Sequence, residues 1–155
     1  MKNYIFLLPL YNDWDSFRIL LGRINLQMKN IDKTGEIYIV NDFSTKKPPK
    51  FNALSNIKNI NILNLRKNVG SQKAISIGLR HLEKFEKEMI ITILDSDGED
   101  DTDKIPTMIE HAERENNKVI VSTRTKRREN NIFKLLYPIH KLLTFVFTLQ
   151  WISFG

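Results

Sequence analysis

Apolar runs alternate with amphipathic segments along the chain. Short apolar runs bounded by turn formers or charged residues are typical of buried strands, and apolar residues recurring every three or four positions are typical of helices. We therefore predict strands at residues 4–8, 36–40, 60–65, 89–94 and 119–122. We predict helices at residues 14–28, 71–85 and 102–115. Asp13 or Asp15 is expected to cap the first helix, and Thr102 the third.

This alternation predicts an α/β fold with a mostly parallel sheet. Strands that are apolar throughout, between amphipathic helices, indicate a sheet covered by helices on both faces. Such sheets bind ligands outside the carboxyl ends of their strands. The chain of 155 residues has the length of one domain and shows no internal repeat. We expect the functional residues at the strand ends of this domain.

The amino-acid composition limits the kinds of binding and catalytic site that the chain can contain. Hydrophobic residues make up 41% of the chain and charged residues 27%, which favours a folded domain over a disordered one. Cysteine is absent, so disulfides, thiolate metal sites and a cysteine nucleophile are excluded. The three histidines lack metal-ligand spacing. A bound metal ion would therefore be held by oxygen ligands.

Charge is segregated along the sequence. The formal net charge is +6, yet residues 95–103 hold six acids in nine positions. Residues 124–141 hold six Lys or Arg and a single acid, Glu129. Two different kinds of ligand are implied, one that needs carboxylates and one that is anionic.

The C-terminal segment 131–155 is apolar on nearly all sides, and we separate it from a domain at residues 1–130. Two interpretations remain open. With the preceding basic residues it can lie at a membrane interface, each Lys or Arg near anionic headgroups contributing about 1 kcal/mol. Alternatively it is a core helix that packs on a further half of the protein. Pro138, His140, Lys141 and Gln150 argue against a simple membrane span.

The most informative motif is the D-x-D of Asp95 and Asp97, which directly follows a predicted buried strand. Two carboxylates at a strand end can face one hard divalent cation and leave positions open for a diphosphate. The alternative is a solvated acidic loop that caps the next helix. We expect metal binding for Asp95 and Asp97, and capping for Asp101 and Asp103.

Four separated blocks, in the same order, resemble the motifs of family 2 glycosyltransferases. The blocks are residues 8–13 (LPLYND, like V-P-x-Y-N-E), 40–45 (VNDFST, like V-D-D-G-S-T), 64–70 (NLRKNVG, with Ala74 and Gly78) and 94–97 (LDSD). Residues 95–106 and 121–124 are also similar to the metal-motif region and the arginine-bearing strand end of polyprenyl-phosphate sugar transferases. The resemblance implies the GT-A (Rossmann-like) fold over nearly the whole chain.

The resemblance also implies how a nucleotide-diphosphate sugar, of the UDP or GDP type, would be bound. Pro9, Tyr11 and Asp42 would lie along the nucleotide base. Asp97 would ligate Mg²⁺ or Mn²⁺, with Asp95 beside it near the metal or the ribose. The motif blocks add three further donor-site residues, Asp13, Asn68 and Gly70.

The implied catalytic residues are Asp97, Glu99 and Arg124. Glu99 stands where related enzymes carry an amide close to the acceptor or the metal. Arg124 and Arg127 would clamp phosphate oxygens through planar, charge-assisted hydrogen bonds. The implied reaction transfers the sugar with inversion to a polyprenyl phosphate or saccharide acceptor. We expect a cytoplasmic protein at the cytoplasmic face of the membrane, because residues 1–9 do not form a cleavable signal.

Several positions depart from the family pattern. Asn41 replaces the first acid of the turn and Phe43 replaces its glycine, so we expect a variant turn that avoids a positive φ at Phe43. Family enzymes continue beyond the point of Gly155 into an acceptor-binding half, so we expect this chain to correspond to the nucleotide-binding half.

Three alternatives remain. The first is a non-catalytic nucleotide-sugar-binding remnant or subunit. The second is a haloacid-dehalogenase-like phosphatase, whose D-x-D-G loop resembles residues 95–98 but normally follows the first strand. The third, a nucleic-acid-binding module, is disfavoured because the acids around Asp97 would repel a phosphate backbone.

Overall fold

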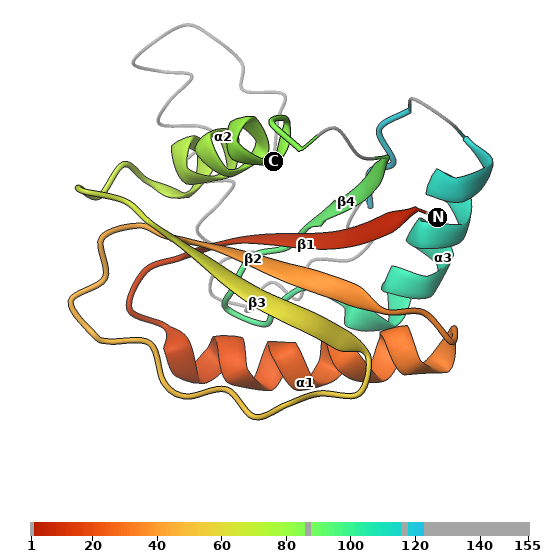
Figure 1. Cartoon of the computed structure of the whole chain (residues 1–155), viewed down its shortest axis with the longest axis horizontal. Helices are drawn as coiled ribbons and strands as arrows, with labels where there is room; N and C mark the ends of the chain where they lie inside the picture. Colours follow the sequence, from red (N-terminus) through yellow and green to blue (C-terminus); the bar gives the residue numbers. More distant parts are fainter. Residues whose placement is uncertain (1, 86–87, 116–117, 123–155) are drawn as a thin grey trace, which may run out of the picture. The chain divides into compact units, whose positions relative to one another are not determined.

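A computed structural model of the chain describes residues 2–85, 88–115 and 118–122 (Figure 1). The chain divides into two compact units, residues 1–120 and 121–155, and every described helix and strand belongs to the first. The boundary expected after residue 130, and the apolar segment 131–155, lie outside the described residues. Within the described ranges, none of the helices is both long enough and apolar enough to cross a bilayer.

Four strands form one sheet, all parallel, in the order β3-β2-β1-β4. The strands are β1 (Asn3–Leu10), β2 (Gly35–Asn41), β3 (Ile57–Asn64) and β4 (Met89–Ile93). The helices are α1 (Trp14–Asn30), α2 (Ser71–Leu82) and α3 (Ile105–Arg114), the last preceded by a 3₁₀ turn at Thr102–Lys104. These elements lie close to their predicted positions, and the predicted α/β fold is confirmed.

Helices cover both faces of the sheet, as its apolar strands require. Phe6, Leu8 and Leu10 of β1 are buried in one cluster with residues of α1 and α3. Ile5 and Leu7, at the alternate positions of the same strand, are buried in a second cluster with residues of α2. Figure 1 shows α2 on one side of the sheet and α1 on the other. Because β1 is central and buried on both faces, its position and register fix those of its neighbours.

The strand predicted at residues 119–122 is wrong. Residues 118–122 have no regular secondary structure, and Val119 is 90% exposed. A short apolar run forms a strand only where it can hydrogen-bond to the edge of a sheet. The sequence pattern does not show whether such an edge lies nearby, which is why the prediction failed.

The helix caps agree in part with the prediction. Asp13 caps α1, where its Oδ1 accepts a hydrogen bond from the Ser16 amide at 3.3 Å. Thr102 does not cap the third helical segment. Asp101 takes that place, accepting from the Asp103 amide at 3.1 Å, and Thr102 is the buried first residue of the turn. Asp103 itself accepts a hydrogen bond from Gln27 and is not a cap.

Helix α2 approaches the sheet closely at Gly78. A Cβ added there would lie 2.6 Å from Leu7 Cδ1 and 2.8 Å from Val40 Cγ2, both on fully buried side chains. Gly22, in the middle of α1, has nothing within 4 Å of the same added atom. Replacing either glycine with alanine raises helix propensity, but only the change at Gly78 also crowds the core.

We expect Gly78→Ala to destabilise the protein by about 1–3 kcal/mol, because overpacking at Leu7 and Val40 outweighs the gain in helix propensity. Gly22→Ala, the matched control, should stabilise it by about 0.5–1 kcal/mol. Urea unfolding of both variants measures the difference. Equal effects of the two changes would contradict the close packing of α2 on the sheet.

Three polar side chains join the amino ends of the strands to α3. The Tyr4 hydroxyl and the Lys33 ammonium both donate to Glu113 Oε1, and Lys33 Nζ lies 4.9 Å from the centre of the Tyr4 ring. The hydrogen bond from Lys33, and then that from Tyr4, lowers the pKa of Glu113 below its ordinary value. The ionised carboxylate is thus preferred in the folded state.

A carboxyl whose pKa is lower in the folded state contributes stability above its unfolded pKa, near 4.3, and loses that contribution as the pH falls through the folded value. We expect Glu113→Gln to lower the free energy of unfolding at pH 7 by up to about 1 kcal/mol, the range of partly exposed ion pairs. The difference between the variant and the wild type should be smaller at pH 3 than at pH 7. Urea unfolding at the two pH values tests this, and a difference that does not shrink at low pH would contradict it.

Candidate functional site

The carboxyl ends of β1, β2 and β4 lie at one edge of the sheet. Leu10 pairs with Asn41, and the Asp42 amide donates to the Leu10 carbonyl at 2.8 Å, so Tyr11 and Asp42 leave the sheet together. On the other side of β1 the Leu94 amide donates to the Leu7 carbonyl at 3.2 Å, which places the loop beginning at Asp95 beside the end of β1.

Pro9 lies in β1 beside the point where β4 ends. The Leu7 carbonyl faces β4, and alternate residues of a parallel strand direct their polar groups to the same side. The nitrogen of Pro9 therefore faces the side where β4 has already ended at Ile93. A proline is tolerated there because no ladder hydrogen bond is lost. The two chains diverge beyond this point, and a pocket lies between them.

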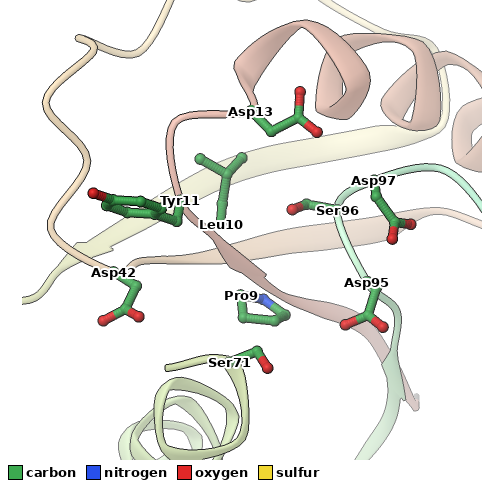
Figure 2. A pocket seen from close by; sticks show the side chains of 9 residues that line it. All are labelled: Pro9, Leu10, Tyr11, Asp13, Asp42, Ser71, Asp95, Ser96 and Asp97. Atoms are coloured by element: carbon green, nitrogen blue, oxygen red, sulfur yellow. The ribbon is translucent and has the colours of Figure 1, made fainter. Parts of the chain in front are cut away.

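An open pocket of about 360 Å³ occupies this edge. Figure 2 shows Tyr11 and Asp42 on one side of it, Asp95 and Asp97 on the other, and Pro9 between them. The complete lining comprises Pro9, Leu10, Tyr11, Asp13, Asp42, Ser71, Asp95, Ser96 and Asp97. The two sequence blocks that were predicted to bind base and metal thus face one space.

Asp42 is buried and holds the loop between β3 and α2. Its Oδ1 accepts from the Val69 amide at 2.7 Å and its Oδ2 from the Gly70 amide at 2.8 Å. The Asn68 side chain donates to the Asp42 carbonyl at 3.2 Å. Only 3% of Asp42 is exposed, so these bonds replace the water that the carboxylate loses. Asp42 therefore positions the start of α2, whose first residue, Ser71, lines the pocket.

The amide of Asn41 is hydrogen-bonded through both its nitrogen and its oxygen. Asn41 Nδ2 donates to Asn64 Oδ1 at 2.8 Å, and its Oδ1 accepts from the Ser44 amide at 3.1 Å. These bonds accommodate asparagine at the position of the first acid of the turn.

The turn after β2 is also tied to the end of β1. Asn12 Oδ1 accepts from the amides of Thr45 and Lys46 at 2.8 and 3.0 Å, and the Asn12 amide donates to Ser44 Oγ at 2.8 Å. The variant turn predicted at Phe43 is wrong, because Phe43 has a φ of 64°, in the left-handed region that favours glycine. A side chain in that conformation costs roughly 1–2 kcal/mol, which the surrounding hydrogen bonds offset.

The acidic loop after β4 folds on itself and on α1. The Glu99 amide donates to Asp97 Oδ1 at 2.9 Å, and the Asp95 amide donates to Asp100 Oδ2 at 3.0 Å. Arg23 donates to the Gly98 carbonyl at 3.2 Å, which holds the loop against the helix. Glu99 lines a second pocket with Arg23 and residues 100–103, so it does not face the space lined by Asp97.

Two carboxylates in the first pocket fit a divalent cation. Asp95 and Asp97 are exposed, belong to one short loop and offer the hard oxygen ligands that Mg²⁺ and Mn²⁺ prefer. In the part of the chain that the structure describes, no group of three or more His, Asp or Glu side chains could hold a metal by itself. Mg²⁺ sites commonly use one or two carboxylates and complete their coordination with water and substrate phosphates.

The pocket gathers six of the residues proposed from the sequence: Pro9, Tyr11, Asp13, Asp42, Asp95 and Asp97. Asn68 and Gly70 contact Asp42 behind it, and Glu99 lies in the neighbouring pocket. Arg124 and Arg127 lie outside the described residues. Sequence reasoning missed Leu10, Ser71 and Ser96, although Ser71 directly follows a recognised block and could have been found as the first residue of a helix.

We expect Asp42→Asn to destabilise the protein by about 1–3 kcal/mol, because an amide oxygen can replace only one of the two carboxylate oxygens that accept from Val69 and Gly70. Hydrogen exchange of these two amides should accelerate, while amides in the middle of α1 serve as the internal control. Unchanged protection of both amides would show that the carboxylate does not hold this loop.

Residues 6–151 match the family Glycosyl transferase family 2. The Undecaprenyl-phosphate 4-deoxy-4-formamido-L-arabinose transferase of Pectobacterium carotovorum is 27% identical over 139 residues, which is 88% of this chain and 41% of that protein. The protein of the same name from Photorhabdus laumondii is 28% identical over 137 residues, covering 86% of this chain and 40% of that protein.

Among solved structures, the crystal structure of S. aureus TarS 1-349 is similar with a TM-score of 0.49 and 20% identity, over 74% of this chain and 33% of that one. This chain spans about two fifths of the length of the curated relatives it matches. Because the family match extends over most of its residues, the chain belongs to glycosyl transferase family 2.

Proposed function

We propose that this chain binds a nucleotide-diphosphate sugar together with Mg²⁺ or Mn²⁺ and supports inverting transfer of the sugar to a polyprenyl phosphate. The observation that carries the proposal is the shared pocket, in which Asp95 and Asp97 face Tyr11 and Asp42. Family membership supports glycosyl transfer, and the printed names of the relatives support undecaprenyl phosphate as the kind of acceptor.

The charge of the pocket explains why a cation is needed. Asp13, Asp42, Asp95 and Asp97 all line it, and a nucleoside diphosphate would add further negative charge. A divalent ion held by Asp95 and Asp97 would supply Lewis-acid stabilisation of the charge on the departing diphosphate. Ser71 brings the positively polarised N-terminus of α2 into the pocket lining, which also favours phosphate.

The nucleotide base would lie at Tyr11, which is 52% exposed and offers a ring face for stacking. Asp42 already accepts two backbone hydrogen bonds, so its main contribution is to fix the pocket wall. Its carboxylate oxygens have remaining lone pairs that can accept from a base N–H. We therefore assign Asp42 a positioning role and Tyr11 the direct contact.

The proposed reaction is a single displacement. An oxygen of the acceptor phosphate attacks the anomeric carbon and forms the new C–O bond. The C–O bond to the nucleoside diphosphate breaks, and the diphosphate leaves with the electron pair. A phosphate monoester has a second pKa near 6, so this acceptor is already ionised at neutral pH and needs no general base. Glu99, in the neighbouring pocket, is proposed to lie toward the acceptor side.

Phosphate contacts by Arg124 and Arg127, and peripheral attachment of residues 131–155 to the cytoplasmic face of the membrane, complete the proposal. Both rest on the sequence, where four basic residues precede an apolar segment. The phosphatase alternative loses its support, since the chain belongs to another family and its D-x-D loop follows β4 and not β1.

Isothermal titration with UDP, GDP and their sugars, with and without Mn²⁺, tests the proposal. We expect binding that requires the cation, and we expect Asp97→Asn to weaken it by at least the roughly 10–100-fold that loss of an outer-shell partner costs a metal site. Asp15→Asn, the same change of charge at an exposed position of α1 that lines neither pocket, should leave affinity unchanged.

The outcomes separate the remaining functions. Absence of nucleotide binding under every metal condition would overturn the transferase proposal. Cation-dependent binding without turnover of undecaprenyl phosphate would favour the non-catalytic donor-binding subunit. That second candidate accounts for the shared pocket as well as the transferase does, because both must bind the donor.

A further inference from the structure

Phe43 combines a strained backbone with an exposed aromatic ring. In the described part of the chain, three residues other than glycine have a positive φ: Asn12 at 60°, Asp32 at 52° and Phe43 at 64°. Asn and Asp adopt the left-handed conformation readily because their short polar side chains bond locally. Phenylalanine has no such compensation, so its presence at this position requires another explanation.

The fold gains little from the ring of Phe43. The side chain is 54% exposed, and it belongs to neither of the two buried apolar clusters. Glycine would take the same conformation without strain and would leave less apolar surface in water. Since neither packing nor conformation favours phenylalanine, the exposed ring itself is the feature to explain. Strain retained beside a pocket is a recognised sign of function.

The backbone places Phe43 next to Tyr11. The Leu10 carbonyl accepts from the Asp42 amide at 2.8 Å, and the Asn12 amide donates to Ser44 Oγ at 2.8 Å. Tyr11 lies between Leu10 and Asn12 on one chain segment. Phe43 lies between Asp42 and Ser44 on the other. Two adjacent strand ends thus carry two aromatic residues that are each about half exposed. Tyr11 itself lines the first pocket with Leu10 and Asp42, and Phe43 follows Asp42 directly, just beyond that lining.

We propose that Phe43 and Tyr11 together form an aromatic platform that binds the nucleobase of the donor, and that Phe43 is a specificity-determining residue for nucleotides over ligands without a base. This inference rests on the proposed function and adds a residue to it. Aromatic rings suit this position because stacking needs no charge, whereas the carboxylates of the pocket repel anions.

The test uses the full chain with Mn²⁺ and three ligands: UDP, GDP and inorganic pyrophosphate, which lacks a base. Phe43→Asn keeps a residue type suited to the left-handed conformation and removes the ring, and Phe43→Gly does the same without a side chain. Both should bind UDP and GDP roughly tenfold or more weakly. Phe43→Tyr should bind them as the wild type does. Ile19→Ala, at a 61% exposed position of α1, is the control for loss of exposed apolar surface.

Pyrophosphate affinity should be unchanged in every variant, because the diphosphate end of the site keeps its residues. Thermal unfolding of Phe43→Gly should occur at or above the wild-type temperature, which shows that any lost affinity is not lost folding. If the wild type binds nucleotides and Phe43→Asn and Phe43→Gly bind them equally well, the aromatic platform is contradicted while the proposed function stands. An equal loss for pyrophosphate would also overturn it, by showing that the turn acts through its shape. If the wild type binds no nucleotide, the proposed function itself fails.

Discussion

The parallel pairing of β1 with both β2 and β4 is the constraint on which the site depends. A strand buried on both faces cannot shift its register without moving apolar side chains out of the core, so Phe6 to Leu10 fix the position of both neighbours. Three strand ends then meet at one edge, and the residues that follow them face a common space. Asp42 and Asp95, which lie far apart in the sequence, become opposite walls of one pocket for this reason.

The walls of the pocket are positioned by side chains that hydrogen-bond to other elements. Asp42 ties the loop before α2, Asn12 ties the turn after β2, and Arg23 ties the acidic loop to α1. Each bond joins a different pair of elements, so the walls of the pocket are positioned by the whole domain and not by one loop. This arrangement is what a site needs when it must hold several charges close together without collapse.

The proposed function divides the site into two ends. Asp95 and Asp97 would accept a diphosphate only with a cation, while the exposed rings of Tyr11 and Phe43 would receive the base. The triad of Tyr4, Lys33 and Glu113 lies at the opposite ends of the strands and contributes to stability. The proposed site and this triad therefore lie at opposite edges of the same sheet.

The sequence by itself determined the fold class, the order of the elements and the residues at the strand ends. Apolar periodicity records burial, and burial on both faces leaves few arrangements other than a parallel sheet covered by helices. The D-x-D and V-N-D blocks could be recognised because local chemistry, carboxylates after a buried strand, is written in adjacent residues.

Only the tertiary structure decided which groups are already bonded and which edges are paired. The sequence could not show that Asp42 accepts from Val69 and Gly70, that Phe43 keeps a positive φ, or that residues 119–122 form no strand. Each of these depends on partners distant along the chain. Hydrogen bonding and strand pairing depend on residues that come together only in the folded chain, so they cannot be read from a pattern of neighbouring residues.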